Sequence, residues 1–325
     1  MIKVEHLTKY YGEFLAVDDL SFEIGEGQVY GFLGPNGAGK STTMNIMTGC
    51  LSATSGKVEI GGFDIFEDPD QAKRLIGYLP EQPPLYMNET PLEYLHFVGQ
   101  AKGLRGQALE DQIQNVVDKV GIRPVTHKRI SALSKGYKQR VGIAQALLGD
   151  PKVIILDEPT VGLDPLQIIE IRDLIKDLGK NHTVILSSHI LSEVQAICEK
   201  ILIIAHGKLV AFDRAENLEN TLLSDSEITL LTGAKPEQVT KILAGVEGVG
   251  DYTQTPGEEG MLTVSIKTGD RDLYGLSSRV FAAFAKSGGT LAELRVKKAT
   301  LEDIFIQLTE TPKAAGAGKK EAEEK

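Results

Sequence analysis

The sequence predicts an α/β fold, in which a mostly parallel sheet carries an antiparallel β layer and a helical insertion, followed by a small C-terminal α+β domain. Three observations lead to this prediction. Short apolar runs alternate with helical segments over the first 220 residues. A glycine-rich stretch at residues 34–42 joins one such run to a helix. Beyond residue 226 the order of segments changes to strand, helix, strand, strand, helix, strand.

The composition indicates an ordinary globular protein that stays in the cytoplasm. The chain has 325 residues, of which 42% are hydrophobic and 25% charged, so it is long enough for two domains. No apolar stretch approaches the ~20 residues of a membrane-spanning helix, and residues 1–5 lack the apolar core of a secretory signal. The net charge of −10 gives no long-range attraction to nucleic acid. We therefore expect no nucleic-acid partner. The net charge does not exclude a local basic patch. Cys50 and Cys198 have no partner at metal-ligand spacing and are expected to be reduced thiols.

Two groups of strands are expected before residue 220. The first is the antiparallel layer, predicted from β-branched residues at 2–5, 15–24 and 57–60. The second is the parallel sheet, predicted from short and nearly continuous apolar runs, because such runs suit strands covered by helices on both faces. These runs are residues 29–33, 153–156, 184–187 and 201–204.

The helical insertion is expected between residue 90 and about residue 140. Thr90 can cap a helix, Pro91 fits its first turn, and Glu93 completes a capping box. Gly103 and Gly121 indicate breaks between successive helices.

The C-terminal part predicts a ferredoxin-like α+β domain. Polar residues 219–226 have no clear periodicity and indicate a boundary. The order β-α-β-β-α-β is the split βαβ arrangement, with strands at 227–231, 246–253, 261–266 and 291–296 and helices at 236–243 and 271–286. A capped helix beginning at Thr300 is expected to close the domain, and the Ala-, Gly-, Lys- and Glu-rich tail is expected to be disordered or a frayed helix. The expected domains are residues 1–220 and 226–310, followed by the tail 311–325.

Residues 34–42 match the phosphate-binding pattern G-x-x-x-x-G-K-[ST], which predicts a P-loop NTPase core. The stretch is Gly34-Pro35-Asn36-Gly37-Ala38-Gly39-Lys40-Ser41-Thr42. Glycines let backbone N–H groups curl around phosphate oxygens, and the following helix adds the positive end of its dipole. Lys40 would reach the β- and γ-phosphates, and the Ser41 hydroxyl would hold Mg²⁺. The alternative is a chance glycine-rich turn, which the strand before the loop and the helix after it disfavour.

Two carboxylates follow the apolar run at 153–156. A strand of this kind would present Asp157 at its carboxyl end, beside the phosphate loop, where it can bind Mg²⁺ directly or through water. Glu158 is suited to polarise a water molecule for attack on the γ-phosphate. Taken alone, such a pair is most often a strand that meets solvent, but the upstream phosphate loop favours the functional interpretation.

A longer set of motifs resembles the ATP-binding cassette (ABC) ATPases. The signature stretch is Leu133-Ser134-Lys135-Gly136-Tyr137-Lys138-Gln139-Arg140, and it is followed by Asp157-Glu158-Pro159-Thr160 and Gly162-Leu163-Asp164. The resemblance covers residues 1–220 in the order of the family. It implies that ATP and Mg²⁺ are bound and that two copies form a dimer around ATP. Ser134 and Gly136 would then contact the γ-phosphate of ATP on the second copy. The common family pattern is Leu-Ser-Gly-Gly-Gln, and here Lys135 and Tyr137 depart from it.

The same resemblance implies roles for four more residues. His189 matches the switch histidine, which contacts the γ-phosphate and holds Glu158 and the attacking water. Gln82 matches the glutamine that bridges Mg²⁺, water and the helical insertion. Asp164 matches the aspartate that tunes the dimer interface. Tyr11 takes the place of the aromatic ring that stacks on adenine, with Tyr10 as the competing candidate and core packing as the alternative for both.

Residues 299–305 and the domain before them resemble the ATPase subunits of two-component exporters of the gliding-motility and daunorubicin type. This implies an integral-membrane permease as partner and a peripheral position on the inner face of the cell membrane. The permease would dock near residues 82–93, with Tyr86 and Met87 as candidate contacts. Three alternatives stay open: a soluble ABC ATPase that acts on a non-transport macromolecule, a non-catalytic nucleotide sensor, and a C-terminal domain that only stabilises a dimer or regulates.

Overall fold

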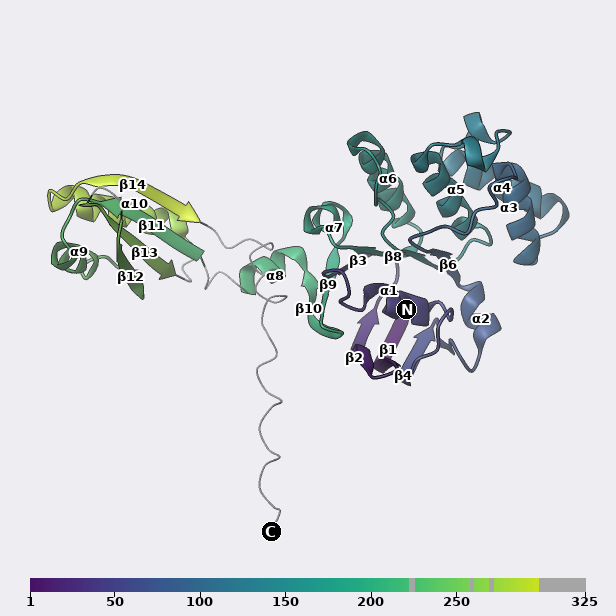
Figure 1. Cartoon of the computed structure of the whole chain (residues 1–325), viewed down its shortest axis with the longest axis horizontal. Coiled ribbons are helices and arrows are strands. Elements are labelled where there is room, and N and C mark those ends of the chain that lie inside the picture. Colours follow the sequence, from purple (N-terminus) through teal and green to yellow (C-terminus); the bar gives the residue numbers. More distant parts are fainter. Residues whose placement is uncertain (222–225, 258–259, 269–271, 298–325) are drawn as a thin grey trace, which may run out of the picture. The chain divides into compact units, whose positions relative to one another are not determined.

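The computed structural model describes residues 1–221, 226–257, 260–268 and 272–297 (Figure 1). The chain folds into two compact units, Met1–Arg214 and a second that begins at Ala215, and each has its own hydrophobic core. This division precedes the boundary region expected at 219–226, and the domain limits 1–220 and 226–310 stay a prediction. The expected helix from Thr300 and the tail 311–325 lie outside the described residues.

The first unit contains an antiparallel sheet in the strand order β2-β1-β4-β5. Buried and more exposed residues alternate along its strands, with Ile2, Val4 and Leu7 on the covered face. The antiparallel layer predicted from the sequence is therefore confirmed. Its strands are β1 (Ile2–Tyr11), β2 (Phe14–Ile24), β4 (Ser55–Ile60) and β5 (Phe63–Asp64).

A six-stranded sheet in the order β10-β9-β3-β8-β7-β6 forms the centre of this unit. Every residue of β3, β7 and β8 is buried, as expected for strands covered on both faces. All neighbouring pairs are parallel except β9 with β10. The predicted parallel strands are confirmed as β3 (Val29–Leu33), β7 (Val153–Leu156), β8 (Thr183–Ser188) and β9 (Lys200–Ala205).

Two strands of this sheet were not predicted from the sequence. The strand β6 (Ile76–Leu79) has four residues and includes Gly77, so it gives no clear apolar run. The glycine has a packing reason, because a Cβ at Gly77 would lie 2.2 Å from the carbonyl oxygen of Ala146. The strand β10 (Lys208–Arg214) lies at the edge of the sheet and is only partly buried, so it lacks the pattern of the central strands.

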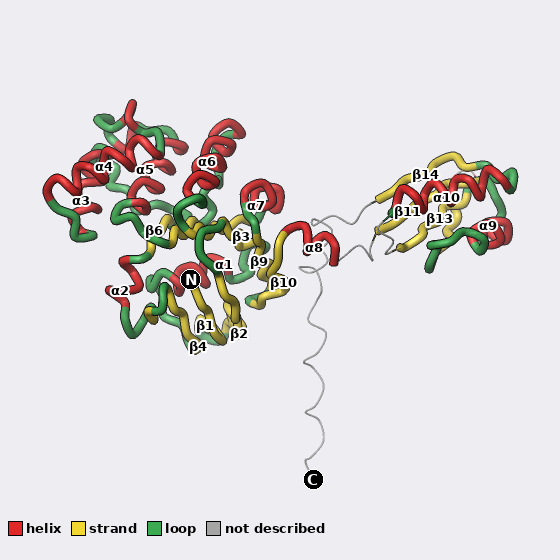
Figure 2. Tube along the Cα trace, turned by 180° about the vertical axis from the view of Figure 1, so that it is seen from behind, coloured by secondary structure: helices red, strands yellow, loops and turns green. Residues whose placement is uncertain are grey.

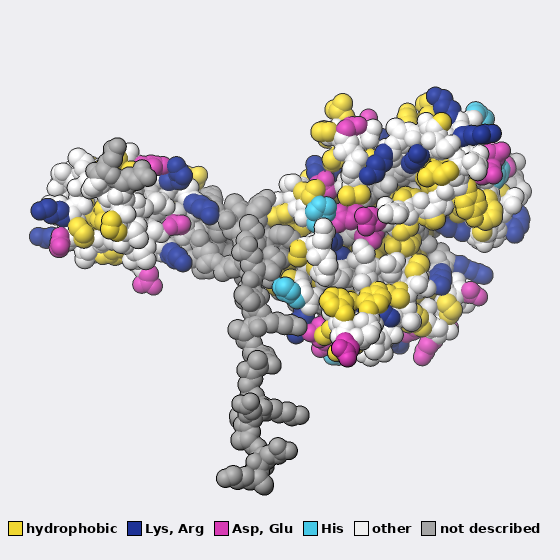
Figure 3. Space-filling model, viewed as in Figure 1, with side chains coloured by type: hydrophobic (Ala, Val, Ile, Leu, Met, Phe, Trp, Pro, Cys, Tyr) yellow, Lys and Arg dark blue, Asp and Glu magenta, His cyan; other side chains and the backbone are white. Residues whose placement is uncertain are grey.

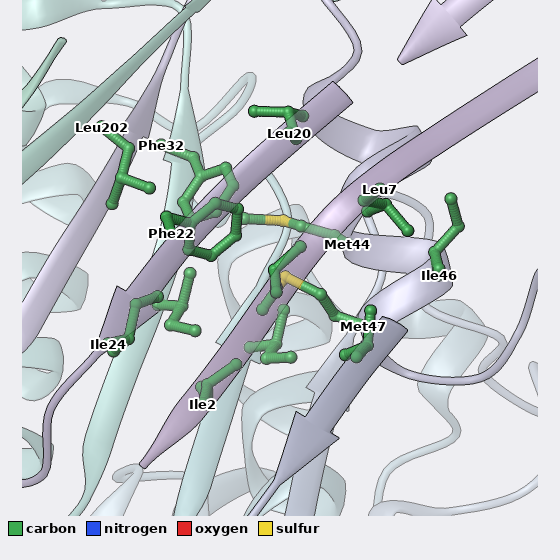
Figure 4. Close-up of a cluster of buried hydrophobic side chains, with 14 of the residues drawn as sticks. Ile2, Leu7, Leu20, Phe22, Ile24, Phe32, Met44, Ile46, Met47 and Leu202 are labelled. Carbon is green, nitrogen blue, oxygen red and sulfur yellow. The ribbon is translucent and has the colours of Figure 1, made fainter. Parts of the chain in front are cut away.

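Helices separate and cover the two sheets (Figures 1 and 2). Helix α1 (Lys40–Met47) lies between the six-stranded sheet and the antiparallel layer, and α6 (Pro165–Leu178) and α7 (Leu191–Ile197) lie on the opposite face. Figure 4 shows Met44 and Met47 of α1 packed among side chains from both sheets. Phe22 and Phe32 meet there edge to face, with ring centroids 5.5 Å apart. This packing fixes the start of α1, and with it the glycine-rich loop before it.

The helical insertion is confirmed. Thr90 Oγ1 accepts a hydrogen bond from Glu93 N at 3.3 Å, and Glu93 Oε2 accepts one from Thr90 N at 2.8 Å, which completes the predicted capping box. Both Gly103 and Gly121 have positive φ and lie between helices. The elements from here to the signature are α3 (Pro91–Ala101), α4 (Gly106–Lys119), the short 3₁₀ turns η1 (Arg123–Val125) and η2 (Ile130–Ala132), and α5 (Lys135–Leu147); α2 (Pro69–Arg74) precedes β6.

The second unit has the predicted β-α-β-β-α-β order and an antiparallel sheet in the order β12-β13-β11-β14. One strand prediction was wrong at its start: residues 246–248 form a bend and a turn, residues 249–251 are irregular, and the strand begins at Tyr252. Gly248 has a φ of 92°, and Val249 N bonds back to the carbonyl of Val246, so this stretch cannot stay extended. Within the described ranges, no helix is long and apolar enough to cross a bilayer. The elements are α8 (Ala215–Thr221), β11 (Ser226–Thr232), α9 (Pro236–Leu243), β12 (Tyr252–Pro256), β13 (Leu262–Thr268), α10 (Leu273–Lys286) and β14 (Leu291–Lys297).

Candidate active site

A cavity of about 380 Å³ opens where the loops that follow β3, β7 and β8 meet. The carboxyl ends of parallel strands lie at one edge of a sheet, and ligands of α/β proteins bind there. Figure 3 shows acidic side chains and a histidine together in a hollow of this unit. The cavity is lined by Tyr11, Phe14, Ala16, Asn36, Gly37, Gly39, Lys40, Ser41, Thr42, Glu81, Glu158, Val161 and His189.

The loop from Gly34 to Gly39 needs glycine for steric reasons. A Cβ at Gly34 would lie 2.3 Å from the carbonyl oxygen of Ile204, so β9 approaches the loop backbone directly. Gly39 caps α1 with a φ of 103°, and a Cβ there would lie 2.6 Å from the carbonyl oxygen of Ala16. The loop is therefore shaped by its own backbone and opens the amino end of α1 towards the cavity, where anions are favoured.

Lys40 lies at the floor of the cavity and is only 6% exposed. Its ammonium donates hydrogen bonds to the carbonyl oxygens of Gly34 at 2.8 Å and Pro35 at 3.2 Å, and it lies 3.8 Å from Glu158 Oε1. Burial lowers the pKa of Lys40, and the carboxylates of Glu158 and Asp157 act in the opposite direction. An ammonium held in this way can exchange loop carbonyls for the oxygens of a phosphate.

Asp157 follows β7 and is 2% exposed. Its Oδ1 accepts hydrogen bonds from Ser41 Oγ at 3.2 Å and from Ser187 Oγ at 2.5 Å. The carboxylate thus lies against the helix that follows the phosphate loop. A carboxylate beside a hydroxyl is a donor set that suits a hard divalent cation, provided that nucleotide oxygens and water complete the coordination.

Glu158 has a backbone conformation that few residues of its type adopt, with a φ of 47°. Such a conformation costs about 1–3 kcal/mol and needs support from its surroundings. Part of that support is the hydrogen bond from Glu158 N to Ser187 Oγ at 2.8 Å. The side chain lies 3.0 Å from His189, between Oε2 and Nδ1, and both residues line the cavity.

Ser134 and Gly136 of the signature, together with Asp164, line a second pocket of the same unit, also about 380 Å³, and do not line the first. Ser134 caps α5 by accepting a hydrogen bond from Tyr137 N at 3.3 Å, and Asp164 caps α6 by accepting one from Gln167 N at 2.9 Å. Gly136 faces the side chain of Gln167, which a Cβ at this position would meet at 2.5 Å. One chain therefore carries the phosphate loop and the signature in two separate places.

Of the remaining expected residues, some line the first cavity and others do not. Tyr11 lines the first cavity and is 49% exposed, whereas Tyr10, similarly exposed, does not line it. Gln82 is exposed and lies outside the lining, while its neighbour Glu81 belongs to it. Ser187, which holds both Asp157 and the backbone of Glu158, was missed. The polar pair Ser187-Ser188 at the end of a buried strand was the signal that could have revealed it.

Comparisons with known proteins agree with this geometry. Residues 17–161 match the model of the family described as ABC transporter. The bacitracin transport ATP-binding protein of Bacillus licheniformis is 34% identical over 310 residues, which cover 95% of this chain and 97% of that protein. The linearmycin resistance ATP-binding protein of Bacillus subtilis (strain 168) is 32% identical over 95% of this chain and 98% of that protein.

Solved structures give the same result for the first unit. A dimeric ATP-binding cassette in a post-hydrolysis state, bound to ADP and Pi, is 27% identical, with a TM-score of 0.60 over 66% of this chain and 98% of that one. The motif resemblance of residues 1–220 is thus confirmed, and the matches to these two ATP-binding proteins extend through the second unit. The chain belongs to the ABC transporter family and is its ATP-binding, ATP-hydrolysing subunit.

Proposed function

We propose that two copies of this chain close around two ATP molecules, each held between the phosphate loop of one copy and Ser134 and Gly136 of the other. The separation of the two pockets within one unit carries this proposal, because each copy then offers two half-sites. Asp164, which lines the signature pocket, would adjust the contact between the copies. The dimeric cassette among the similar structures supports the same arrangement.

Within each closed site, residues of the first cavity perform the chemistry. Lys40 binds the β- and γ-phosphates through its buried ammonium. Glu158 accepts a proton from the attacking water, and His189, 3.0 Å away, orients that carboxylate and contacts the γ-phosphate. The backbone N–H groups of residues 34–42, apart from Pro35, which has none, bind the phosphate oxygens. Tyr11 stacks on adenine, and its place in the lining favours it over Tyr10.

Ser41 and Asp157 are the residues that would hold Mg²⁺, with Gln82 as a further ligand. The hydroxyl and the carboxylate already lie 3.2 Å apart, and both are oxygen donors of the kind that Mg²⁺ prefers. No cluster of three His, Cys, Asp or Glu side chains suited to a metal occurs among the described residues, so nucleotide oxygens must contribute. When bound, the cation would neutralise charge on the β- and γ-phosphates.

The partner of the dimer is a separate integral-membrane permease, which holds the ATPase on the cytoplasmic face of the membrane. An exposed apolar cluster at the start of the helical insertion, formed by the loop before α3 and by α3 itself, is suited to such contact. Tyr86, Met87 and Phe97 are each about half exposed, and the rings of Tyr86 and Phe97 lie 5.2 Å apart. Two similar proteins are named for bacitracin transport and linearmycin resistance, which favours export as the direction of transport.

The proposal is tested with Glu158→Gln, which keeps the shape of the side chain but removes its basicity. This variant should bind ATP, hydrolyse it at least about a hundredfold more slowly, and accumulate as a dimer in light scattering. Adding Ser134→Ala to it should weaken the dimer, because the second half-site loses a phosphate contact. A Glu158→Gln protein that stays monomeric at saturating ATP contradicts the shared site.

A further inference from the structure

Glu193, a residue of α7 that does not line the cavity, lies at a junction between the two loops that carry Glu158 and His189. It is 5% exposed. Its Oε2 accepts a hydrogen bond from Thr160 Oγ1 at 2.6 Å and another from Ser188 Oγ at 3.2 Å. Both hydroxyl-bearing residues are at most 5% exposed, so their hydroxyls have few alternative partners in water.

The two partners of Glu193 lie next to the residues of the reaction. Thr160 is two residues beyond Glu158, and Val161 N bonds to the carbonyl of Glu158 at 3.2 Å. Ser188 directly precedes His189, and its Oγ also accepts a hydrogen bond from Ile190 N at 3.0 Å, which closes a turn around the histidine. A single carboxylate therefore connects the loop after β7 to the last residue of β8, which directly precedes His189.

The same carboxylate also faces α6. Glu193 Oε1 lies 3.9 Å from Arg172 Nη2, and α6 begins directly after Asp164. In the part of the chain that the structure describes, the Nε of Arg172 is buried without a hydrogen-bond partner. Glu193 is thus the carboxylate with which this arginine forms an ion pair.

We propose that Glu193 is a positioning residue for ATP hydrolysis. It fixes the relative placement of Glu158 and His189 by holding Thr160 and Ser188 together, and it touches neither the nucleotide nor the water. Glu158 has the strained φ of 47°, so the loop that carries it relaxes unless such contacts hold it. This inference rests on the proposed roles of Glu158 and His189, and it predicts a defect in turnover without a defect in nucleotide binding.

The test compares Glu193→Ala with Glu193→Gln in the full chain. The alanine variant should lower kcat by about tenfold or more, because small displacements of reacting groups are that costly, while the Kd for ATP changes less than about twofold. The glutamine variant keeps an acceptor oxygen for Thr160 and should retain kcat within about threefold. Ser192→Ala, an exposed position on the same helix, is the matched control and should behave as the unmodified protein.

Other results for these variants would overturn the inference or separate it from the proposed function. An unchanged kcat in Glu193→Ala overturns the inference, and so does a parallel loss of kcat and ATP affinity, since that would indicate a general loss of structure. If Glu193→Ala does not fold, Thr160→Val removes only the 2.6 Å hydrogen bond and must show the same selective loss of kcat. Glu158→Gln is measured beside them. If it too retains turnover, the proposed roles fail, whereas a normal Glu193→Ala beside an inactive Glu158→Gln rejects only the role of Glu193.

Discussion

At the scale of single residues, the site is held in shape before any nucleotide enters. The ammonium of Lys40 is bound by carbonyls of its own loop, and the carboxylate of Asp157 is bound by two hydroxyls. Buried polar groups that are already paired lose little conformational entropy when a ligand replaces one partner by another. The nucleotide therefore meets a preorganised pocket, and preorganised dipoles are what stabilise developing charge in a transition state.

The two cysteines should differ sharply in reactivity. Burial raises the pKa of the Cys198 thiol, whereas Cys50 is exposed. A disulfide reagent at pH 8 should therefore label one thiol per folded chain rapidly and both after denaturation in guanidinium. Because the pKa of Cys198 is higher in the folded chain than in the unfolded one, its contribution to stability is complete below about pH 8.5 and declines above it. Cys50→Ser should remove the rapid phase, and two rapid thiols in the folded protein would contradict the burial of Cys198.

At the scale of elements, α7 matters because it packs against the central sheet and also contacts the residues next to Glu158 and His189. The helix begins just after His189, carries Glu193 and packs against the central strand β3. Gly31 makes this close packing possible. A Cβ there would lie 2.2 Å from Val194 Cγ1 and 3.0 Å from Cys198 Sγ, and both of those residues belong to α7 or follow it directly.

Gly31→Ala should therefore displace α7. Overpacking of this kind costs about 1–3 kcal/mol, so we expect a lower melting temperature for the first unit and a lower kcat for ATP hydrolysis. Thermal unfolding followed by circular dichroism and a steady-state ATPase assay would measure the two effects. Gly250→Ala is the control, because its Cβ would have no contact closer than 3.6 Å. Equal melting temperatures for the two variants would refute the packing argument.

Elements with a strong local signal were predictable from the sequence. The capping box at Thr90 and Glu93 depends on residues three positions apart, so it is visible without the fold. The central strands were found because burial on both faces makes them continuously apolar. The strand β6 was missed because its four residues become a strand only by pairing with β7, and residues 246–251 were misassigned because Gly248 ends the extended conformation.

The candidate site, too, could be predicted from the sequence only in part. Lys40, Ser41, Glu158 and His189 could be named from their motifs, and the cavity does bring them together. The network behind them could not, because Ser187 contacts Glu158 and Glu193 contacts Thr160 across about 30 positions of the chain. Sequence spacing gives no information about such contacts until the strands are placed in order.

At the scale of the whole molecule, the two units have separate cores. In the first, side chains of both sheets pack around α1, whereas in the second α9 and α10 cover one face of a four-stranded sheet. Phe284 is fully buried in the second core. Among the residues that the structure describes, those of that core all belong to the second unit.

Calorimetry of the full chain should consequently show two unfolding transitions. ADP at a hundred times its Kd should stabilise only the first unit, by about 2.7 kcal/mol. Phe284→Ala should destabilise only the second unit, by about 3–5 kcal/mol, and leave the affinity for ADP unchanged. Leu276→Ala in the same core provides a second variant of the same kind. A single transition that responds to both ADP and Phe284→Ala would contradict independent cores.

The placement of the phosphate loop and the signature in two pockets of one unit has a genetic consequence. In the proposed dimer, a chain lacking Lys40 can pair with a chain lacking Ser134. One of the two shared ATP sites would then have both defects, and the other would have neither. Two variants that are each inactive alone would then complement one another when both chains are made in the same cell. Two variants with lesions in the same pocket would not.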